Sequence, residues 1–474
     1  MKIFPIIGLE VHIELKTKSK MFCACSADHF HVEPNTHTCP VCLGLPGALP
    51  VPNQTACEWC LKLGLALNCE INSQTFFERK NYFYPDLAKG YQITQLQKPF
   101  AINGKIFLND HQIRINRAHM EEDTGKSVHL TLHGEDVTLL DFNRSGVPLV
   151  EIVSEPDITS AKQAKEYLNK IQQLVRYICI SDADIEKGSM RCEPTINVKI
   201  ETDDGQTVYT PLVEIKNVAS LTGVMTAIDF EINRQVEEWK TNGTTKNDTN
   251  KTTRGWDADK NQTFLQREKE GSADYRYFPE PDIPPIEFSQ FQIEQIKSTL
   301  PELPDAKIAK YRALNLSDYD AKLLAQNSDF ASIFEKVLDN STDSEFAKFI
   351  TNLLIGPLKT ISLDIEKINP DYFKNIFDHR NELNSTSIKQ LAIESYETGT
   401  DPLAIAKSKN LFQISDTSQI EELVKKVIAN NPKAVDDYRK NSQSIGFLIG
   451  QVMKVSAGSA NPQLAKEILE KLLN

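Results

Sequence analysis

Residues 7–15 alternate strictly between apolar side chains and small or polar ones, and this period of two predicts a half-buried β-strand. One face of that strand would carry Ile7, Leu9, Val11, Ile13 and Leu15, and the other would carry Gly8, Glu10, His12 and Glu14. Because successive strand side chains point to opposite faces of a sheet, the segment must bury one face and leave a row of chemically active groups on the other. Glu10 and His12 then share a face, about 7 Å apart.

The whole chain has 474 residues, which suits two to four domains of about 100–200 residues each. Its pattern of apolar and polar residues changes along the sequence. Up to about residue 290 the pattern is mainly that of strands, with a hairpin at Asp204-Gly205 and one long helix over 161–178. Residues 241–263 are rich in Asn and Thr and are predicted to form a mobile loop. Helical periodicity follows the proline cluster PEPDIPP. We therefore predict an α+β chain with domains 1–290, 291–407 and 408–474.

Charge limits the partners that this chain can bind. It holds 53 Lys and Arg against 65 Asp and Glu, a net charge of −12, which excludes a uniformly basic nucleic-acid binder but not a local basic surface. From Glu421 to the end there are eight basic and six acidic residues, so the C-terminal tail is the least acidic part. Its candidates for phosphate contact are Lys425, Lys426, Lys433, Arg439, Lys440 and Lys454.

The N-terminal residues lack the apolar core of a secretory signal, and no window approaches the roughly 18 apolar residues of a membrane span. We therefore expect a cytoplasmic protein with no membrane association. The nine cysteines are an odd number, which argues against a disulfide framework.

Four of these cysteines have the spacing of a metal site. Cys23-x-Cys25 is followed by Cys39-x-x-Cys42, two pairs that suit tetrahedral Zn²⁺ held by four thiolates. A zinc ion with four protein ligands has no open position, so the predicted role is structural. Two alternatives remain open: the thiols are merely buried and reduced, or one ligand is replaced by a histidine of the loop, His29, His31 or His37. Cys57 and Cys60 have helical spacing and are interpreted as helix packing.

A second set of residues combines carboxylates, imidazoles, tyrosines and cations within apolar strand patterns. Carboxylate oxygens with an imidazole are the ligands expected for Mg²⁺ that holds a polyphosphate, although any one of these residues alone would be interpreted as a solvated charge. The set is Glu10, His12, Lys80, Tyr82, Tyr84, Asp86, Lys89, Gln92, His119, Glu121, Glu122, Asp123, Arg144, Glu151, Glu155, Glu214 and Lys216.

Two common catalytic motifs are missing. DTGKS at 123–127 imitates the end of a P-loop, but Met120 stands where the earlier glycine is required. The sequence also has no G-x-S-x-G nucleophile elbow. Any phosphoryl transfer by this chain would therefore depend on metal ions and positioning.

Several long, irregular motifs make the chain recognisable over nearly its whole length. They are GLEVHIEL, NTHTCPVCLGLPGALPVPN, RKNYFYPDLAKGYQITQ, HMEEDTGK, NRSGVPLVEIVSEPD, GSMRCEPTINVKI, VEIKNVASL, TRGWD, DYRYFPEPDIPP, LPELPDAK, NPKAVDDYRK and GFLIGQVMK. With these motifs the chain resembles the family of B subunits of aspartyl/glutamyl-tRNA amidotransferases. It departs from the family at Glu193-Pro194-Thr195, where Asp-Ala-Asn is usual, at Ala88 in place of a proline, and at residues 219–221.

The resemblance implies an ATP-dependent carbon–nitrogen ligase that works in a heterotrimer with an amidase (A) subunit and a small C subunit. ATP would phosphorylate the side-chain carboxyl of Glu-tRNA(Gln) or Asp-tRNA(Asn), and ammonia released from glutamine would displace the phosphate. The implied fold is an antiparallel β cradle similar to glutamine synthetase, followed by a helical domain and a tail that binds tRNA.

The resemblance also implies roles for individual residues. Mg²⁺ ligands would be Glu10, His12, Glu122 and Glu151, with the longer Glu193 at the variant position near them. Phosphate or the substrate carboxylate would be faced by Lys80, Lys89, Arg144 and Lys216, the last next to Glu214. The acceptor-end pocket or ammonia exit would be shaped by Tyr82, Tyr84 and Asp86.

Two rival functions come from other classes. A non-catalytic RNA-binding or assembly subunit with a zinc knuckle would leave the carboxylates in strand patterns unexplained. A stand-alone ATP-dependent ligase that makes a small amide would leave the long helical tail unexplained. ATP hydrolysis by the reconstituted complex, with and without mischarged tRNA, discriminates between these functions.

Overall fold

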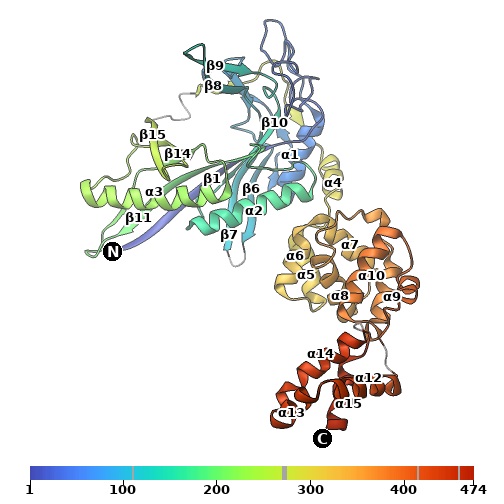
Figure 1. Ribbon diagram of the computed structural model, residues 1–474. Coiled ribbons are helices and arrows are strands. Elements are labelled where there is room, and N and C mark those ends of the chain that lie inside the picture. Colours follow the sequence, from blue (N-terminus) through green and yellow to red (C-terminus); the bar gives the residue numbers. More distant parts are fainter. Residues whose placement is uncertain (109–110, 269–274, 414–415, 457–458, 474) are drawn as a thin grey trace. The chain divides into compact units, whose positions relative to one another are not determined.

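The computed structural model describes residues 1–108, 111–268, 275–413, 416–456 and 459–473, and the chain forms two compact units, Met1–Leu303 and Pro304–Asn474 (Figure 1). No described helix is both long and apolar enough to cross a membrane. The observed architecture is mixed, with a large sheet in the first unit and helices as the main elements of the described part of the second, which has one isolated β-bridge, between Leu383 and Phe412. This confirms the α+β prediction at the level of fold class, whereas the relation to glutamine synthetase stays a prediction.

A ten-stranded sheet forms the centre of the first unit. Its order is β15-β14-β13-β11-β1-β10-β7-β6-β2, with β12 beside β11, and every pair is antiparallel except the parallel pair β13 and β14. The strands are β1 Lys2–Glu14, β2 Glu70–Ile71, β6 Ala101–Leu108, β7 His111–Glu122, β10 Pro148–Ser154, β11 Met190–Glu201, β12 Thr207–Tyr209, β13 Val213–Lys216, β14 Thr252–Asp257 and β15 Gln262–Glu268.

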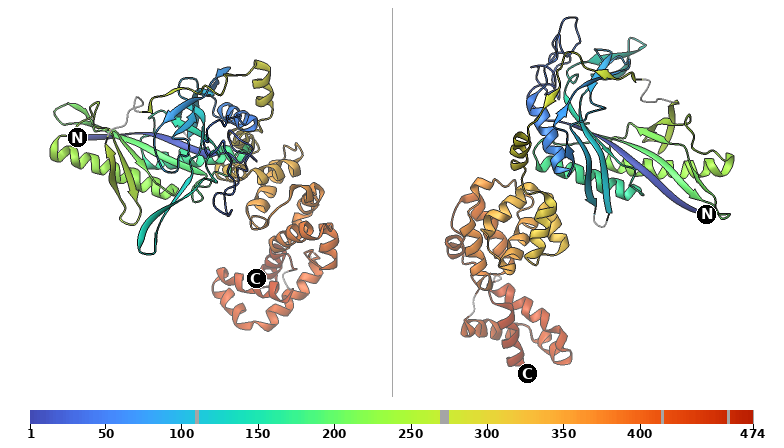
Figure 2. Two further views of the ribbon diagram at one scale, coloured as in Figure 1. Left: turned by 90° about the horizontal axis from the view of Figure 1, so that it is seen from above. Right: turned by 180° about the vertical axis from the view of Figure 1, so that it is seen from behind.

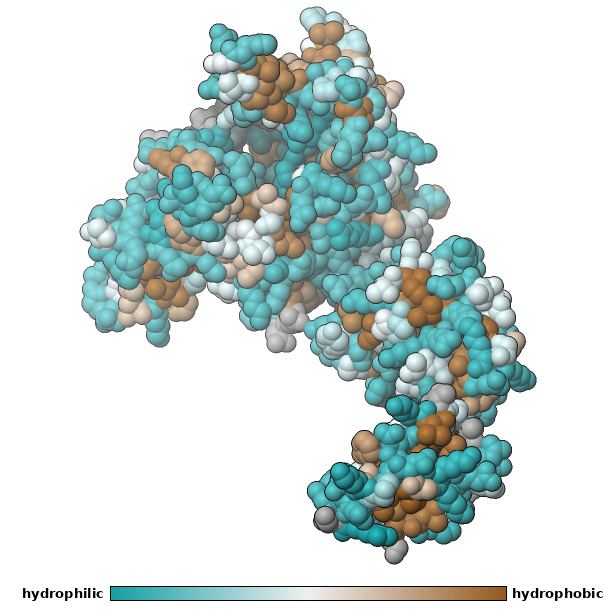
Figure 3. All heavy atoms as spheres, viewed as in Figure 1, coloured by the Kyte–Doolittle hydropathy of each residue, from teal (hydrophilic) through white to brown (hydrophobic). Residues whose placement is uncertain are grey.

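Three smaller sheets accompany it. The first has the order β16-β4-β5, the second pairs β17 with β3, and the third is the hairpin β8–β9. Figure 3 shows apolar side chains exposed over that hairpin, among them Val128, Leu132 and Leu139. The bounds are β3 Gln74–Thr75, β4 Glu78–Asn81, β5 Tyr91–Thr94, β8 Lys126–Leu132, β9 Glu135–Asp141, β16 Phe278–Pro279 and β17 Ile286–Glu287.

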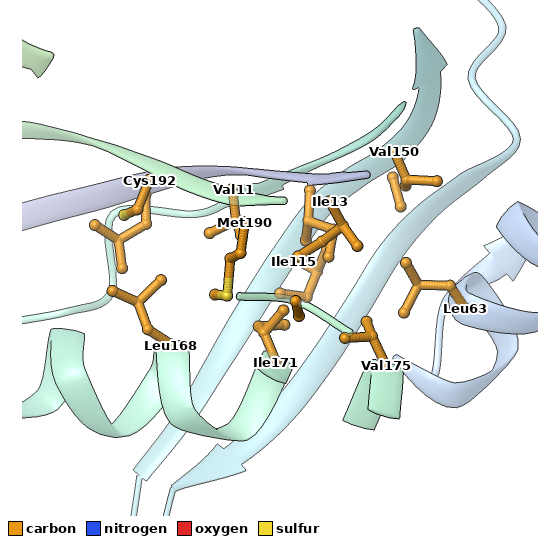
Figure 4. Packing of buried hydrophobic residues seen from close by; sticks show 14 of the residues in the cluster. Val11, Ile13, Leu63, Ile115, Val150, Leu168, Ile171, Val175, Met190 and Cys192 are labelled. Atoms are coloured by element: carbon orange, nitrogen blue, oxygen red, sulfur yellow. The ribbon is translucent and has the colours of Figure 1, made fainter. Parts of the chain in front are cut away.

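Helices cover one face of the large sheet, as the views in Figures 1 and 2 agree. They are α1 (Gln54–Ala66), α2 (Ala161–Tyr177) and α3 (Leu221–Asn242), and α4 (Gln290–Ser298) packs on α1. Figure 4 shows Val11 and Ile13 of β1 pointing toward Leu168, Ile171 and Val175 of α2. The apolar residues predicted for one face of β1 are all at most 1% exposed, so that prediction is confirmed. The opposite face of β1 is left to Glu10 and His12.

Local sequence signals explain the element ends. Ser160 accepts a hydrogen bond from the Gln163 backbone N–H and caps α2, which confirms the predicted helix. Gly205, at a φ of +82°, turns the chain between β11 and β12, which confirms the predicted hairpin.

The loop predicted over 241–263 is wrong in two places. Its first residues end α3, and its last twelve contain β14 and the start of β15. Threonine and tryptophan favour strands, and Trp256 is only 7% exposed and packs on Phe230 of α3. Burial of the Trp256 side chain therefore favours a strand here, although the surrounding residues are mostly polar. The long helix α3 also lies in a region that was predicted to be mainly strands.

The second unit is helical and contains two separate apolar clusters. One cluster is built from α5 Pro304–Ala313, α6 Asp318–Gln326, α7 Ser328–Leu338, α8 Ser344–Ile355, α9 Pro370–Asp378, α10 Ser385–Thr398 and α11 Pro402–Ser408. The other is built from α12 Thr417–Asn430, α13 Pro432–Lys440, α14 Ile445–Val455 and α15 Pro462–Leu473. Short 3₁₀ turns occur at Ile365–Lys367, Arg380–Glu382 and Ser442–Ser444. The three-domain division stays a prediction.

Candidate active site

A polar pocket of about 400 Å³ is lined by residues of the large sheet's polar face together with β4, β5 and residues 275–277. It brings together twelve of the residues that the sequence nominated. They are Glu10, His12, Lys80, Tyr82, Gln92, His119, Glu121, Asp123, Glu151, Glu193, Glu214 and Lys216. Segments more than 200 residues apart in the chain, β1 and β13, contribute to the same wall.

Cross-strand register places a group of metal-ligating atoms at the centre of this pocket. His12 lies opposite Glu151, and Glu151 lies opposite His119, on three neighbouring strands. His12 Nε2 is 3.3 Å from Glu151 Oε2 and 3.6 Å from Glu121 Oε2. The three ligand atoms of His12, Glu121 and Glu151 lie within 4.8 Å of one another. Neighbouring ligands of an ion bound at about 2.1 Å have this kind of spacing, so the donor set fits Mg²⁺.

The electrostatics of the pocket are dominated by this crowding of charge. Burial, together with Glu151, Glu214 and Glu193, raises the pKa of Glu10 to about 7. Burial opposes the charged form of His12, but the hydrogen bond and charge of Glu151 raise the pKa of that imidazole to about 9. The carboxylates crowded around Glu10 would stabilise a cation bound beside them.

Lysines and arginines surround the cluster. Lys80 of β4 is 5.0 Å from the centre of the Tyr275 ring and 5.8 Å from that of Tyr82. Burial opposes the charge of Lys80, but nearby Glu121 raises its pKa. Lys216 Nζ is 2.7 Å from Glu193 and 2.9 Å from Glu214. The glutamate at the variant position 193 thus reaches a lysine of the pocket wall.

Glu122 does not join the cluster, in contrast to the ligand set implied by the resemblance. It follows Glu121 on β7 and points to the other face, where its carboxylate accepts a hydrogen bond from Lys89 and one of 2.9 Å from the Ile93 backbone N–H. The structure therefore puts Glu121 with His12 and Glu151, and it holds Glu122 and Lys89 together outside the pocket lining. The signal for this was local: Ala118 and Met120 are apolar, so residues 119 and 121 belong to the polar face.

Four further nominated residues also lie outside the pocket lining: Tyr84, Asp86, Arg144 and Glu155. Glu155 accepts a hydrogen bond of 2.7 Å from the Asn116 side chain. Arg144 donates to the backbone oxygens of Thr124 and Gly125, at 3.0 and 2.8 Å, and so organises the turn after β7. Tyr84 is 55% exposed, and Asp86 accepts a hydrogen bond from the Thr124 hydroxyl at 3.4 Å.

The lining also contains residues to which sequence reasoning gave no role. Residues 275 and 277 come from DYRYFPEPD, whose distance along the chain hides their place beside Lys80. The others follow the polar alternation of β7 and β11 or the hairpin β14–β15. These additional residues are Arg117, Arg191, Lys251, Arg267, Tyr275 and Tyr277.

The four predicted zinc ligands converge in a loop that leads away from β1. The sulfur atoms of Cys23, Cys25, Cys39 and Cys42 lie within 4.8 Å of one another, and those of Cys39 and Cys42 are 3.9 Å apart. Thiolates at about 2.3 Å from a tetrahedral zinc ion have nearly this separation, so the donor set fits Zn²⁺.

The surroundings favour the thiolate form of Cys42, whereas the hydrogen bond with Cys42 raises the pKa of Cys23 and burial raises that of Cys25 to about 11. The hydrogen bond with Cys23, the Cys39 backbone N–H and the Lys20 charge lower the pKa of Cys42 to about 4. Lys20 is only 1% exposed, and its Nζ is 3.6 Å from the Cys42 sulfur.

The alternatives for the cysteines can be compared with this geometry. No histidine of the described residues belongs to the sulfur cluster. His29 contacts Glu14 at 2.7 Å, and His37 contacts the Asp28 backbone oxygen at 2.7 Å. Cys57 and Cys60 are buried on α1, which confirms their interpretation as helix packing.

Comparison with known proteins gives the family. Residues 5–294 match the family model described as the GatB/GatE catalytic domain, and residues 332–473 match the GatB domain. The chain is 43% identical to a protein of Persephonella marina over 485 residues, with all of both chains covered. It is 42% identical to a protein of Thermotoga petrophila over 491 residues, which cover 100% of this chain and 99% of the relative. It is 43% identical to a protein of Dehalococcoides mccartyi over 493 residues, which cover 99% of this chain and 98% of the relative. All three relatives are named as the B subunit of an aspartyl/glutamyl-tRNA(Asn/Gln) amidotransferase. With a strand-borne carboxylate pocket and matches that cover the whole chain, this protein belongs to the GatB family of amidotransferase B subunits.

Proposed function

We propose that this chain activates the side-chain carboxyl of Glu-tRNA(Gln) or Asp-tRNA(Asn) with ATP and then amidates it with ammonia. The observation that carries the proposal is the convergence of His12, Glu121 and Glu151 in a pocket that cations surround. The names of the relatives support the reaction class, because each describes an amidotransferase that acts on these two tRNAs.

The chemistry requires two displacements. A carboxylate oxygen of the substrate attacks the terminal phosphorus of ATP, so that an O–P bond forms and the bond to the β-phosphate oxygen breaks, releasing ADP. Ammonia then attacks the activated carbonyl carbon, a C–N bond forms, and inorganic phosphate leaves. When Mg²⁺ is bound, it offsets the charge of the phosphate oxygens.

The pocket residues would divide the work of positioning. His12, Glu121 and Glu151 are the proposed metal ligands, and Glu10 lies beside them on β1. Lys80 lines the same pocket, where its ammonium group would offset repulsion between the substrate carboxylate and the nucleotide.

The same proposal includes the other parts of the assembly. We infer that an amidase subunit supplies the ammonia and that a small third subunit completes a heterotrimer. Zinc bound by the four cysteines would brace the loop after β1 without taking part in the chemistry. The first unit would correspond to a cradle of the glutamine synthetase type.

The tail around α12–α15 would bind the tRNA. Lys454 is exposed, and Lys433 lines a cavity beside Phe447, a ring that is 56% exposed. Lys425 pairs with Glu421 at 2.6 Å, and the side chain of Lys440 lies outside the described residues.

The test is ADP formation by the reconstituted complex with and without mischarged tRNA. Glu151→Gln should abolish the tRNA-dependent ADP formation, while the control Glu201→Gln, on β11 and outside the pocket lining, should keep it. Full activity of the Glu151 variant, or ADP formation that ignores the tRNA in the wild type, would contradict the proposal.

A further inference from the structure

Arg117 lacks the short carboxylate contacts that Arg191 and Lys216 make in the same pocket. Arg191 Nη1 donates to Asp123 at 3.0 Å, and Lys216 donates to Glu193 at 2.7 Å. The Arg117 Nη2 atom comes no closer than 3.7 Å to Glu151, which is too long for a hydrogen bond.

The remaining nitrogen atoms of Arg117 are also poorly satisfied. Its Nη1 donates one hydrogen bond of 3.3 Å to the Asn116 side chain. Its Nε is buried and has no hydrogen-bond partner among the described residues. An unpaired buried donor costs free energy, and in a pocket wall this cost is recovered when a ligand brings the missing acceptor.

A β-bulge aims this guanidinium into the pocket. In β7, Ile113 and Ile115 face the core, but beyond Asn116 the core residues become Ala118 and Met120. The pairing of β7 with β10 shifts at the same place. Without the extra residue, position 117 would face the core instead of the pocket.

Glu151 links Arg117 to the metal cluster. Its Oε2 atom is 3.3 Å from His12 Nε2 and 3.6 Å from His119 Nε2, while its Oε1 atom faces Arg117. An oxyanion next to the cluster is therefore also within reach of the arginine fork. The planar guanidinium offers two parallel N–H groups, which match two oxygens of one phosphoryl group.

We propose that Arg117 binds oxygens of the phosphoryl group that passes from ATP to the substrate carboxylate. This inference rests on the proposed function. Arg117 donates hydrogen bonds without giving up a proton, and the donors strengthen as charge develops on the equatorial phosphoryl oxygens. After ammonia has displaced the group, the same donors hold the departing inorganic phosphate.

The test uses Arg117→Gln, Arg117→Lys and the control Arg114→Gln. Arg114 lies on the same strand, is paired with Asp157 at 2.6 Å, and does not line the pocket. In the assembled complex, kcat for tRNA-dependent ADP formation should fall roughly 100-fold or more in the Gln variant, because arginine contacts to a transferred phosphoryl group reach about 10³–10⁵ elsewhere. The KM for mischarged tRNA should stay within twofold.

A binding measurement separates this role from a structural one. Inorganic phosphate, titrated calorimetrically into the full-length chain in the presence of MgCl₂, should bind about tenfold or more weakly to Arg117→Gln. Arg117→Lys, which keeps the charge but loses the fork, should recover part of the phosphate affinity and little of kcat. Arg114→Gln should match the wild type in both measurements.

Three results would overturn the inference. The first is unchanged kcat and phosphate affinity in Arg117→Gln while the wild type is active. The second is a raised KM for mischarged tRNA with unchanged phosphate affinity, which would assign Arg117 to the substrate carboxylate. The third is a parallel loss of phosphate affinity in Arg114→Gln, which would indicate a general charge effect. If the wild type forms no ADP, the proposed function fails, and the phosphate titration still tests Arg117.

Discussion

Glu121 and Glu122 are neighbours in the sequence with opposite structural surroundings, so the same Glu→Gln change should have opposite consequences. Glu122 is 3% exposed and pairs with Lys89, whose side chain is 9% exposed. Glu121 is equally buried but lies with His12 and Glu151 in the candidate metal site. We predict that Glu122→Gln lowers stability and that Glu121→Gln weakens metal-dependent activity.

The size of the stability change follows from the buried ion pair. Removing one partner of such a pair costs about 3–5 kcal/mol. In Glu122→Gln, the amide oxygen of the new side chain can still accept the Ile93 N–H, which favours the lower value, about 3 kcal/mol. At about 2 °C per kcal/mol for a unit of this size, the Tm should fall by about 6 °C.

The Glu121 variant should behave differently. Its amide keeps an acceptor for the Thr94 hydroxyl, now 2.9 Å away, so the Tm should stay nearer that of the wild type. A neutral oxygen is a weaker Mg²⁺ ligand, so the Mg²⁺ concentration for half-maximal ADP formation should rise by at least about 10–100-fold.

Thermal melting of both variants and an Mg²⁺ titration of tRNA-dependent ADP formation measure the two effects. The reasoning is refuted if Glu122→Gln shifts the Mg²⁺ dependence at an unchanged Tm while Glu121→Gln titrates like the wild type. That pattern would mean that the two carboxylates face the opposite way.

Three further predictions concern other parts of the molecule. Metal analysis should find one zinc ion per chain and much less in Cys42→Ser; a zinc-free wild type with four freely alkylated thiols would exclude the site. A chain that ends at Gln413 keeps Phe412 on the helical core but lacks the tail. This truncation should raise the KM for mischarged tRNA and make tRNA binding less dependent on salt, with little effect on the use of a minimal acceptor stem. An unchanged tRNA affinity and salt dependence would show that the tail only packs against the helical domain. Leu168→Ala should lower the free energy of unfolding, measured with denaturant, by about 2–5 kcal/mol, because the fully buried leucine side chain fills the space between α2 and the sheet. A loss below about 1 kcal/mol would contradict this packing.

Local sequence patterns were sufficient for the individual elements. The alternation around Glu10, the cap of α2 at Ser160 and the turn at Gly205 depend on residues within one element or its ends, and the structure has all three. The zinc-ligand spacing is equally local, since all four cysteines lie within twenty residues.

Composition was a poorer guide where one buried contact decided the structure. Residues 252–263 are polar on average, yet Trp256 docks on α3 and turns them into a hairpin. A loop prediction averages over such a residue, because the partner that buries it is not in the same segment.

The sequence by itself determined that one face of β1 packs in the core and that the other carries Glu10 and His12, because successive side chains of any β-strand point to opposite faces. Only the tertiary structure decided which side chains from distant parts of the sequence lie beside Glu10 and His12. The bulge at Asn116 turns Arg117 into the pocket, and the folding of residues 275–277 brings Tyr275 to Lys80. The pairing of Lys89 with Glu122 likewise removes both from the site. These outcomes depend on register and packing between segments far apart in the chain, which no local pattern encodes.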